Sequence, residues 1–377
     1  MANTLTNLFN FIYDSVDVVS RELVGFIPSV YKNSKADMVA KDQNVTYDIV
    51  NTQAAYDITP SNAIPALDTD TPATGTMAIT KSRATKFHWT GEDEKAIGRD
   101  VKTAIQNNKF AQAFRTLSGE MEGDLGALYK HASRAYGTAG TTPFATAGDF
   151  TDASEVARIL KENGAPTSDL QLVINTAAGA KIIGKQSQVH MVGAADPLRQ
   201  GVLLDMAGMQ IRESAQVKDH TKGTGASYQT AAATAAGATA VTLDTGTGTV
   251  LAGDVATFAD EGGTKYVVGT GVTAPGTIQL AAPGAVNAIA DNKAMTIGAG
   301  YAANMAFSRS AIHLLTRLPA MPEGGDQADD VMIVQDPVSG IFFQIAMYKA
   351  YRAVLIEVAV AWGVKAAKTE HIALLLG

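Results

Sequence analysis

The chain of 377 residues contains no cysteine. Disulfide bonds, thiolate zinc sites and cysteine nucleophiles are therefore excluded, and the composition fits a reducing cytoplasm. Basic clusters are missing as well, because the formal net charge is -7 and no Lys/Arg-rich tail or stripe occurs. Neutralisation of phosphates supplies most of the energy of nucleic-acid binding. We therefore expect no tight or sequence-specific contact with DNA.

Long apolar runs are also absent. No stretch approaches the roughly 20 apolar residues that cross a bilayer, and the first residues lack the basic segment, apolar run and cleavage site of a signal peptide. We expect a protein that is neither embedded in a membrane nor exported by that route.

Motifs for catalysis or metal binding are the third absence. The six histidines include no pair at the i, i+4 spacing of a helical zinc site. Glycine-rich strings at 246–248 and 269–271 lie between expected strands, which favours turns over a phosphate-binding loop. The acidic groups at 68–70 and 326–330 lack the spacing of a calcium loop, and no nucleophile elbow or acid–base pair occurs. The sequence predicts no enzymatic activity, no metal and no cofactor.

Apolar residues are abundant instead. Hydrophobic residues make up 46% of the chain and charged residues only 18%. A chain of this length can form several lobes, but its few charges are a sparse cover for the exterior of a monomer. Self-association is a natural way to bury the remaining apolar surface.

The first 23 residues have the periodicity of one amphipathic helix, which ends before Pro28. Polar residues, among them Asp14 and Asp17, lie on its opposite face. This helix packs either on its own core or, as an arm, on a neighbouring molecule. The apolar residues that we assign to contacts of such an arm are Leu5, Leu8, Phe9, Ile12, Tyr13 and Val16.

Two strand-like stretches follow, at 45–50 and 76–89, on either side of a polar segment with several prolines. This pattern predicts a long β-hairpin. An exposed hairpin of this length normally lies on another surface. The residues that we assign to its contacts with a neighbour are Val45, Tyr47, Ile49, Met77, Ile79, Phe87 and Trp89.

A long helix is predicted next, because apolar residues recur at steps of three and four from Ile105 to Tyr136, before Gly137. An α+β lobe should follow, with helices at 154–163 and after 176 around a strand at 170–175. A strand is expected at 209–213. We expect the end of the chain to contain a strand at 304–307, a helix at 309–317 and three strands between 331 and 364.

The stretch from 221 to 298 differs in composition from the rest. It is dominated by Gly, Ala and Thr, with short strand-like runs separated by glycine-containing turns. This is typical of a small antiparallel barrel or sandwich. Because the α+β pattern resumes afterwards, we interpret the stretch as an inserted domain.

Two passages resemble a known family. Asn304 to Pro319, NMAFSRSAIHLLTRLP, resembles a segment of the P-twenty-two-like (protein five) coat proteins of tailed bacteriophages. The sequence Trp362-Gly363-Val364-Lys365, followed by Glu370 and an apolar end, is similar to the closing strand of that family. The order of the elements resembles the α+β Hong Kong 97-type capsid fold.

The resemblance implies a division of the chain into named parts. These are an N-terminal arm (1–42), an extended loop (43–91), a spine helix (92–137), a first part of the peripheral domain (138–185), a first part of the axial domain (186–220), the inserted barrel-like domain (221–298), and the axial domain with peripheral return strands (299–377).

The resemblance also implies a function. The protein would be a major capsid protein that assembles with itself through pentamers and hexamers into an icosahedral shell around double-stranded DNA. Its other implied partners are a scaffolding protein, for which Asp14 and Asp17 are candidate contacts, a portal protein and, on some shells, decoration proteins. Its location would be the virion, after assembly in the cytoplasm of a bacterial host.

Two alternatives stay open at this point. The first is the shell protein of a bacterial nanocompartment, which would enclose a protein cargo in place of DNA. The second is an enzyme or a binding module with an all-β recognition insert. The insert has few aromatic residues, namely Tyr228, Phe258 and Tyr266, which makes a sugar-binding platform less favourable.

Overall fold

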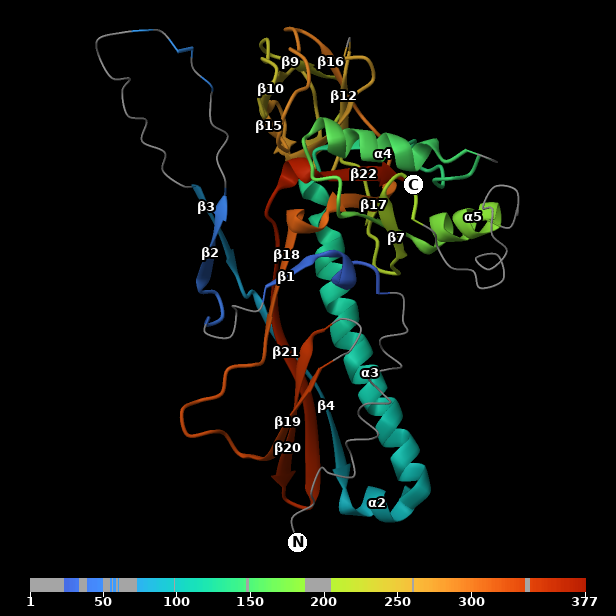
Figure 1. The fold of residues 1–377 in the computed structure, drawn as a ribbon, viewed down its shortest axis with the longest axis vertical. Coiled ribbons are helices and arrows are strands. Elements are labelled where there is room, and N and C mark those ends of the chain that lie inside the picture. Colours follow the sequence, from blue (N-terminus) through green and yellow to red (C-terminus); the bar gives the residue numbers. More distant parts are fainter. Residues whose placement is uncertain are drawn as a thin grey trace.

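The computed structural model describes residues 24–33, 39–49, 73–97, 99–146, 149–186, 205–259, 261–335 and 340–377, with positions 55, 57, 58 and 60. Figure 1 shows an elongated molecule in which one long helix runs beside a sheet, with a lobe and a barrel at one end. The body below and the lobe above are built from segments that lie far apart in the sequence.

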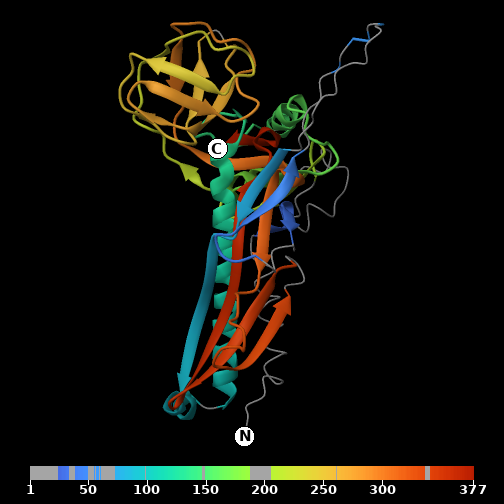
Figure 2. The ribbon, with the colours of Figure 1, turned by 90° about the vertical axis from the view of Figure 1, so that its left-hand side faces the viewer.

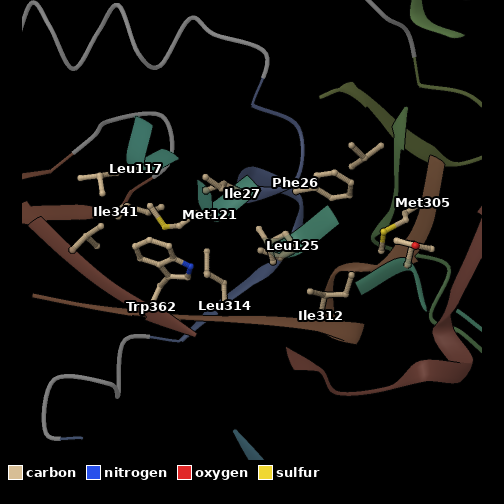
Figure 3. Packing of buried hydrophobic residues seen from close by; sticks show 14 of the residues in the cluster. Phe26, Ile27, Leu117, Met121, Leu125, Met305, Ile312, Leu314, Ile341 and Trp362 are labelled. Carbon is tan, nitrogen blue, oxygen red and sulfur yellow. The ribbon is translucent and has the colours of Figure 1, made fainter. Parts of the chain in front are cut away.

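The long helix is the spine of the body. The short helix α2 (Gly91–Ile97) precedes α3 (Arg99–Gly126), whose 28 residues span about 42 Å. Its apolar stripe is buried, with Phe110, Phe114, Leu117, Met121 and Leu125 at most 1% exposed. Burying each of these large side chains contributes roughly 1.5–3 kcal/mol, so the stripe holds the helix on the sheet (Figure 3).

Six strands form the sheet that α3 covers. They are β1 (Tyr31–Asn33), β4 (Lys81–Thr90), β18 (Ile312–Arg317), β19 (Ala328–Gln335), β20 (Phe342–Ala350) and β21 (Ala353–Ala366). The long strand β21 is central: β4 pairs with one edge, and β20 and then β18 pair with the other. Its alternate residues Ile356, Val358, Val360 and Trp362 point into the core.

The hairpin is a separate two-stranded sheet. Strand β2 (Asn44–Ile49) pairs with β3 (Ala73–Ala78) from Asn44↔Ala78 to Ile49↔Ala73. The hairpin projects from the side of the body, as Figure 1 shows. The predicted second strand at 76–89 is therefore wrong as one element, because β3 belongs to the hairpin and β4 pairs with β21.

The lobe contains a run of five paired strands, three of which are buried over most of their length on both faces. They run β5 (Arg134–Tyr136), β22 (Ile372–Leu376), β17 (Tyr301–Ser308), β6 (Leu170–Ile174) and β7 (Met209–Glu213). In β22, Ile372, Leu374 and Leu376 face the core of the body, whereas Ala373 and Leu375 face the cluster under helices α4 (Thr151–Glu162) and α5 (Thr176–Gln186). Burial on both faces explains why β22, β6 and β17 are largely apolar, whereas β7 exposes Gln210.

The insert is a closed barrel of six strands (Figure 2). The ring runs through β12 (Val255–Phe258), β16 (Ala294–Ile297), β9 (Tyr228–Thr230), β10 (Ala240–Asp244), β15 (Gly276–Leu280) and β13 (Lys265–Thr270), which pairs again with β12. A second small ladder joins β11 (Thr249–Val250) to β14 (Val272–Thr273). Side chains including Tyr228, Phe258 and Tyr266 fill the interior.

The chain passes from the lobe into the barrel and back into the lobe at one place. Strand β8 (Asp219–His220), just before the barrel, pairs with β17, just after it, through His220↔Tyr301 and Asp219↔Ala302. The two ends of the insert are therefore held side by side. This arrangement lets a whole domain interrupt the lobe without separating the strands on either side.

Two other expectations differ from the structure. The predicted helix at 309–317 is wrong, because only Arg309–Ala311 forms a 3-10 turn and β18 follows as a strand that pairs with β21. The long helix ends at Gly126, and the 3-10 segment Ala127–His131 and β5 occupy the rest of its predicted range. Strands β6 and β7, which lie on either side of the expected domain boundary at 185/186, are neighbours in one sheet, and the division into domains stays a prediction.

Candidate functional site

Two sets of predicted site residues lie outside the described residues. They are the apolar contacts of the arm, Leu5, Leu8, Phe9, Ile12, Tyr13 and Val16, and the acidic residues Asp14 and Asp17. Val24 packs against the core of the body. We call residues 24–33 the arm base. Phe26, Ile27 and Val30 are at most 3% exposed and belong to the core of the body. Figure 3 shows Phe26 and Ile27 beside Met121 and Leu125 of α3.

A buried carboxylate holds the arm base. Glu122 of α3 is 1% exposed and accepts hydrogen bonds from the backbone N–H groups of Gly25 (3.3 Å), Phe26 (3.0 Å) and Ile27 (2.6 Å). It also accepts one from the Ser214 hydroxyl at 2.8 Å, just after β7. Burial raises the pKa of Glu122, while the bonds from Ile27, Phe26, Ser214 and Gly25 act in the opposite direction. One side chain therefore joins arm, long helix and lobe.

The hairpin base is held by a small apolar cluster. Met77 (4% exposed) and Ile79 (0%) pack with Leu315 of β18 and Ala361 of β21. Val45 and Tyr47 of β2 are partly buried against the same cluster. We call residues 39–49 and 73–80 the hairpin base.

An ionic network holds Lys81, the first residue of β4, against α3. The Lys81 ammonium lies 3.0 Å from Glu120 and 2.8 Å from Asp124, and the indole N–H of Trp362 donates to Asp124 at 2.9 Å. Burial lowers the pKa of Lys81, but the hydrogen bonds to Asp124 and Glu120 outweigh it, and the net shift is upward. All three charged side chains keep about a quarter to a third of their surface exposed, so the network stabilises only modestly.

The arm base and the hairpin base meet at His313. Strand β1 pairs in parallel with β18, with Tyr31 opposite His313. The Tyr31 ring centroid lies 5.1 Å from that of His313, and the Tyr47 ring of the hairpin lies 5.2 Å from it. Both distances are typical of aromatic pairs. Burial lowers the pKa of His313.

The predicted hairpin contacts fall into two groups. Met77, Ile79 and Trp89 are at most 5% exposed within the single subunit, and their assignment to a neighbour also stays a prediction. They are covered by their own chain, because Met77 and Ile79 pack on Leu315 and Ala361 and β4 pairs with β21. Phe87 likewise packs edge-on against Phe110, with ring centroids 5.0 Å apart. The partly exposed residues Val45, Tyr47 and Ile49 lie on the projecting strand β2. For these three the contact with a neighbour stays a prediction.

Sequence reasoning missed several residues of these junctions. Glu122 stands beside the apolar stripe, with Ser118, Gly119, Leu125 and Gly126 at the i±3 and i±4 positions, so it has no basic partner on its own helix. The lack of a basic partner on its own helix was the feature of the sequence that indicated a partner for Glu122 elsewhere in the chain. Ile58, on the segment between β2 and β3, is 90% exposed and is an additional apolar candidate for a contact.

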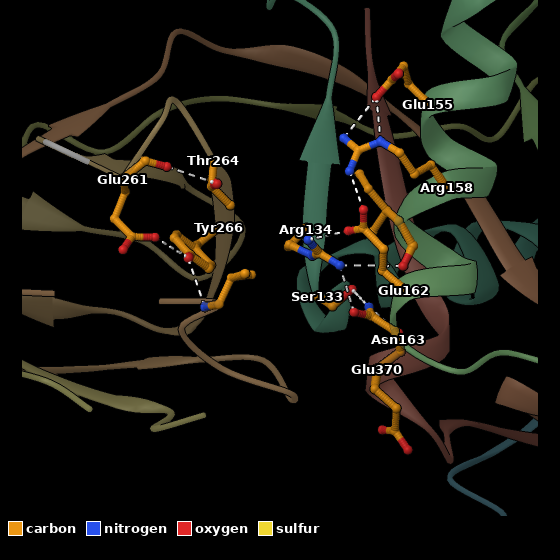
Figure 4. Close-up of polar contacts among 12 residues, drawn as sticks. Ser133, Arg134, Glu155, Arg158, Glu162, Asn163, Glu261, Thr264, Tyr266 and Glu370 are labelled. Carbon is orange, nitrogen blue, oxygen red and sulfur yellow. Dashed lines mark hydrogen bonds and ion pairs between the residues drawn. The ribbon is translucent and has the colours of Figure 1, made fainter. Parts of the chain in front are cut away.

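The barrel is joined to the lobe by strand pairing and by a polar network. Strand β13 pairs with β5 through Tyr266↔Arg134. Figure 4 shows Arg134 between the barrel and α4, where it donates to Glu162 at 2.9 Å and to Asn163 at 2.8 Å. Asn163 in turn donates to Ser133 and to the backbone oxygen of Glu370. These bonds bring the barrel, α4 and the C-terminal segment together.

A second barrel junction contains a histidine between a carboxylate and a tyrosine. His220 Nε2 lies 2.8 Å from Asp254, and its Nδ1 lies 2.9 Å from the Tyr129 hydroxyl. Asp254 also accepts from the backbone N–H groups of Gly223 and Leu251. The three side chains are at most 7% exposed, and a substrate cannot reach a hydroxyl that is buried this deeply. The arrangement is a structural link.

The described residues contain no group of three or more His, Asp or Glu side chains that could hold a metal ion. Within the same residues, no helix is long and apolar enough to span a membrane. The described residues form a body to which the arm base and the hairpin base are both anchored.

Comparison with solved structures identifies the fold. The chain is similar to a chain of the capsid of the cyanophage P-SCSP1u, with a TM-score of 0.52 and 11% identity over 92% of this chain and 86% of that chain. A chain of Mycobacterium phage Che8 aligns with a TM-score of 0.47 and 12% identity over 93% and 90%. A chain of the virus-like particle from Pyrococcus furiosus aligns with 0.44 and 9% over 98% and 100%.

No protein-family model matches the chain, and no curated protein matches it. At identities this low the structural likeness establishes the fold alone. The assignment of the fold depends on the cyanophage capsid, because the TM-score of that alignment exceeds 0.5. The expected α+β Hong Kong 97-type fold is confirmed. The closer resemblance to P-twenty-two-like coat proteins stays a prediction.

Proposed function

We propose that this chain is the major capsid protein of a tailed bacteriophage. Copies of it assemble through pentamers and hexamers into an icosahedral shell that encloses double-stranded DNA. The observation that carries the proposal is a fold shared with the cyanophage P-SCSP1u capsid over 92% of the chain. The lack of basic clusters fits a container that does not bind DNA tightly.

The geometry suggests how such a subunit would join its neighbours. Strands β2 and β3 form a separate two-stranded sheet that packs on the body only at the small cluster around Leu315 and Ala361, and a two-stranded hairpin on its own is at best marginally stable in water. Val45, Tyr47, Ile49 and Ile58 would therefore be covered by an adjacent subunit. The arm would extend from the base that Glu122 holds and place Leu5 to Val16 on another neighbour.

The proposed parts of the subunit follow from the same fold. Residues 43–91 would be the extended loop, α3 the spine helix, and the barrel an insertion in the axial domain. An insertion at this place supports the closer relation to P-twenty-two-like coat proteins. Through the arm, Asp14 and Asp17 would contact a basic scaffolding protein, and a portal protein would occupy one vertex.

Negative-stain electron microscopy tests the proposal. The protein would be expressed with and without the scaffolding gene from its own genome. We expect uniform closed particles several hundred Å across with the scaffold, and aberrant shells or spirals without it. A monomer or dimer under both conditions would contradict the proposal, and particles filled with a protein cargo would favour the nanocompartment alternative.

Deletion of residues 1–23 tests the arm. The deletion leaves Val24 to Asn33 in place, so the bonds from the arm base to Glu122 persist and the subunit should stay folded. We expect soluble subunits that do not form closed shells, with circular dichroism as the control for folding. Closed shells of normal size would show that the arm is not needed.

The pair Asp14→Asn and Asp17→Asn tests the scaffold contact separately. Surface charge pairs weaken as salt screens them. We expect weaker scaffold binding at low salt and a smaller salt dependence than in the unmodified protein. Unchanged binding across salt concentrations would remove these two residues from the proposal.

A further inference from the structure

We propose that the arm base and the hairpin base are coupled inside each subunit through His313 and one turn of α3, so that displacement of either segment loosens the other. The coupling is a property of the single chain. Its consequence for a shell rests on the proposed function, because only in a shell would the arm and the hairpin contact different neighbours.

The first connection is the side chain of His313. It contacts Tyr31 of the arm base and Tyr47 of the hairpin base, with ring centroids 5.1 and 5.2 Å away. Tyr31 and Tyr47 are 16 residues apart in sequence and belong to different sheets. A shift of either tyrosine removes one of the two rings that flank His313.

The second connection is the remainder of strand β18. Asn33 of the arm base is paired with Leu315, and the side chain of Leu315 packs against Met77 and Ile79 of the hairpin base. His313 and Leu315 are two positions apart on a strand, so they point to the same face. The residue between them, Leu314, is buried on the other face in the core of the body. The strand is therefore held from both sides.

The third connection is the turn of α3 from Glu120 to Asp124. Glu122 binds the arm base, whereas Glu120 and Asp124 bind Lys81, the residue that directly follows the hairpin base. At 100° per residue, the side chain of Glu122 points about 160° away from that of Glu120 and about 160° away from that of Asp124. Opposite sides of the same turn thus hold the two segments.

Close packing turns these contacts into coupling. Interiors packed at protein density do not deform continuously, so a displaced group forces its neighbours to move. In a shell, an arm moved by one neighbour would alter how firmly the hairpin is held for another. The contact of the arm with one neighbour would thus be coupled to the contact of the hairpin with another, without any change in the barrel.

Hydrogen exchange on the full-length, unassembled subunit tests the coupling. The variant Tyr31→Ala removes a ring that is 48% exposed and is not part of the hairpin. We expect amides of β2 and β3 to exchange at least about fivefold faster, the lower end of typical couplings between sites. Linkage is reciprocal, so Tyr47→Ala should accelerate exchange at residues 29–33 by a similar factor.

Matched variants separate coupling from general damage. Tyr31→Phe keeps the ring and should exchange like the unmodified protein, and Tyr351→Ala removes an 89% exposed ring elsewhere in the body and should leave the hairpin unaffected. Amides of the barrel strands β10 and β15 are the internal reference. If Tyr31→Ala accelerated those as well, the milder Tyr31→Leu would take its place.

Faster exchange confined to residues 24–33 in Tyr31→Ala, with β2 and β3 unchanged, would overturn the inference. Microscopy of the same variants tests the proposed function separately. A subunit that never forms shells yet shows the reciprocal exchange would refute the shell function and retain the coupling. Normal shells from a subunit without the reciprocal change in exchange would refute the coupling and retain the shell function.

Discussion

The backbone of Gly363 in β21 lies directly against the carbonyl oxygen of Ala78 at the end of β3, so close that any Cβ at position 363 would collide with it. The next residues confirm the approach, because the Thr80 N–H donates to the carbonyl oxygen of Trp362 at 3.2 Å. The hairpin thus crosses onto the body at a point where a glycine leaves room for another backbone.

Gly363→Ala should therefore destabilise the protein. The clash is with backbone that cannot rotate away, and overpacking of this kind costs about 1–3 kcal/mol. Denaturant unfolding measures the effect. Gly91→Ala is the control, since a Cβ at that position meets no atom within 4 Å. Equal stability of the two variants would contradict the close approach.

Glu122→Gln should weaken the arm base. The amide has one acceptor oxygen where the carboxylate has two, and its NH₂ group would face donors. Four donors converge on Glu122, so at least one would lose its partner, at a cost of about 1–3 kcal/mol in unfolding free energy.

Glu120→Gln is the matched control on the same helix. Its side chain is 31% exposed, and loss of such a partly exposed pair should cost less than about 1 kcal/mol. An equal loss in both variants, measured by denaturant unfolding, would show that burial of Glu122 does not set its importance.

His313 should make the junction sensitive to acid. Its folded-state pKa lies below the ordinary 6.5 because of burial. The unfolded chain therefore takes up the proton first, and the stability contributed by neutral His313 is complete above pH 6.5 and declines as the pH falls through the folded pKa. His313→Phe keeps a ring between Tyr31 and Tyr47 but does not titrate.

The measurement is the difference in unfolding free energy between His313→Phe and the unmodified protein across pH. It isolates His313 from His131 and His371, whose pKa values burial also lowers. We expect the variant to gain relative stability as the pH drops below 6.5. Parallel curves would mean that His313 does not contribute to the pH dependence.

Asp254→Asn should loosen the barrel at its junction with the lobe. Asp254 is fully buried and accepts from His220, Gly223 and Leu251. The amide would leave buried donors unpaired, which costs roughly 1–3 kcal/mol. Asp244→Asn, on a barrel strand away from this junction, is the control. Hydrogen exchange at residues 219–223 should rise in the first variant alone, and a rise in both would contradict a specific link.

The local pattern of the sequence determined several parts of this protein. The steps of three and four from Phe110 to Leu125 predicted the buried face of α3, which the structure confirms. The apolar runs at 170–174 and 304–307 indicated strands, and the change of composition at 221–298 indicated an inserted β domain, which is a closed barrel. Each of these signals depends on neighbours within one element, where periodicity and turn residues decide the conformation.

Tertiary structure alone decided how these elements meet. The segment 76–89 divides into two strands because Met77 pairs with Val45, whereas Lys81 pairs with Trp362, far away in the sequence. The segment 312–317 has an apolar pattern that also fits a helix, and pairing with β21 makes it a strand. Short apolar runs carry no information about their distant partners. For the same reason the roles of Glu122 and His313 appear only when arm, hairpin and helix are brought together in space.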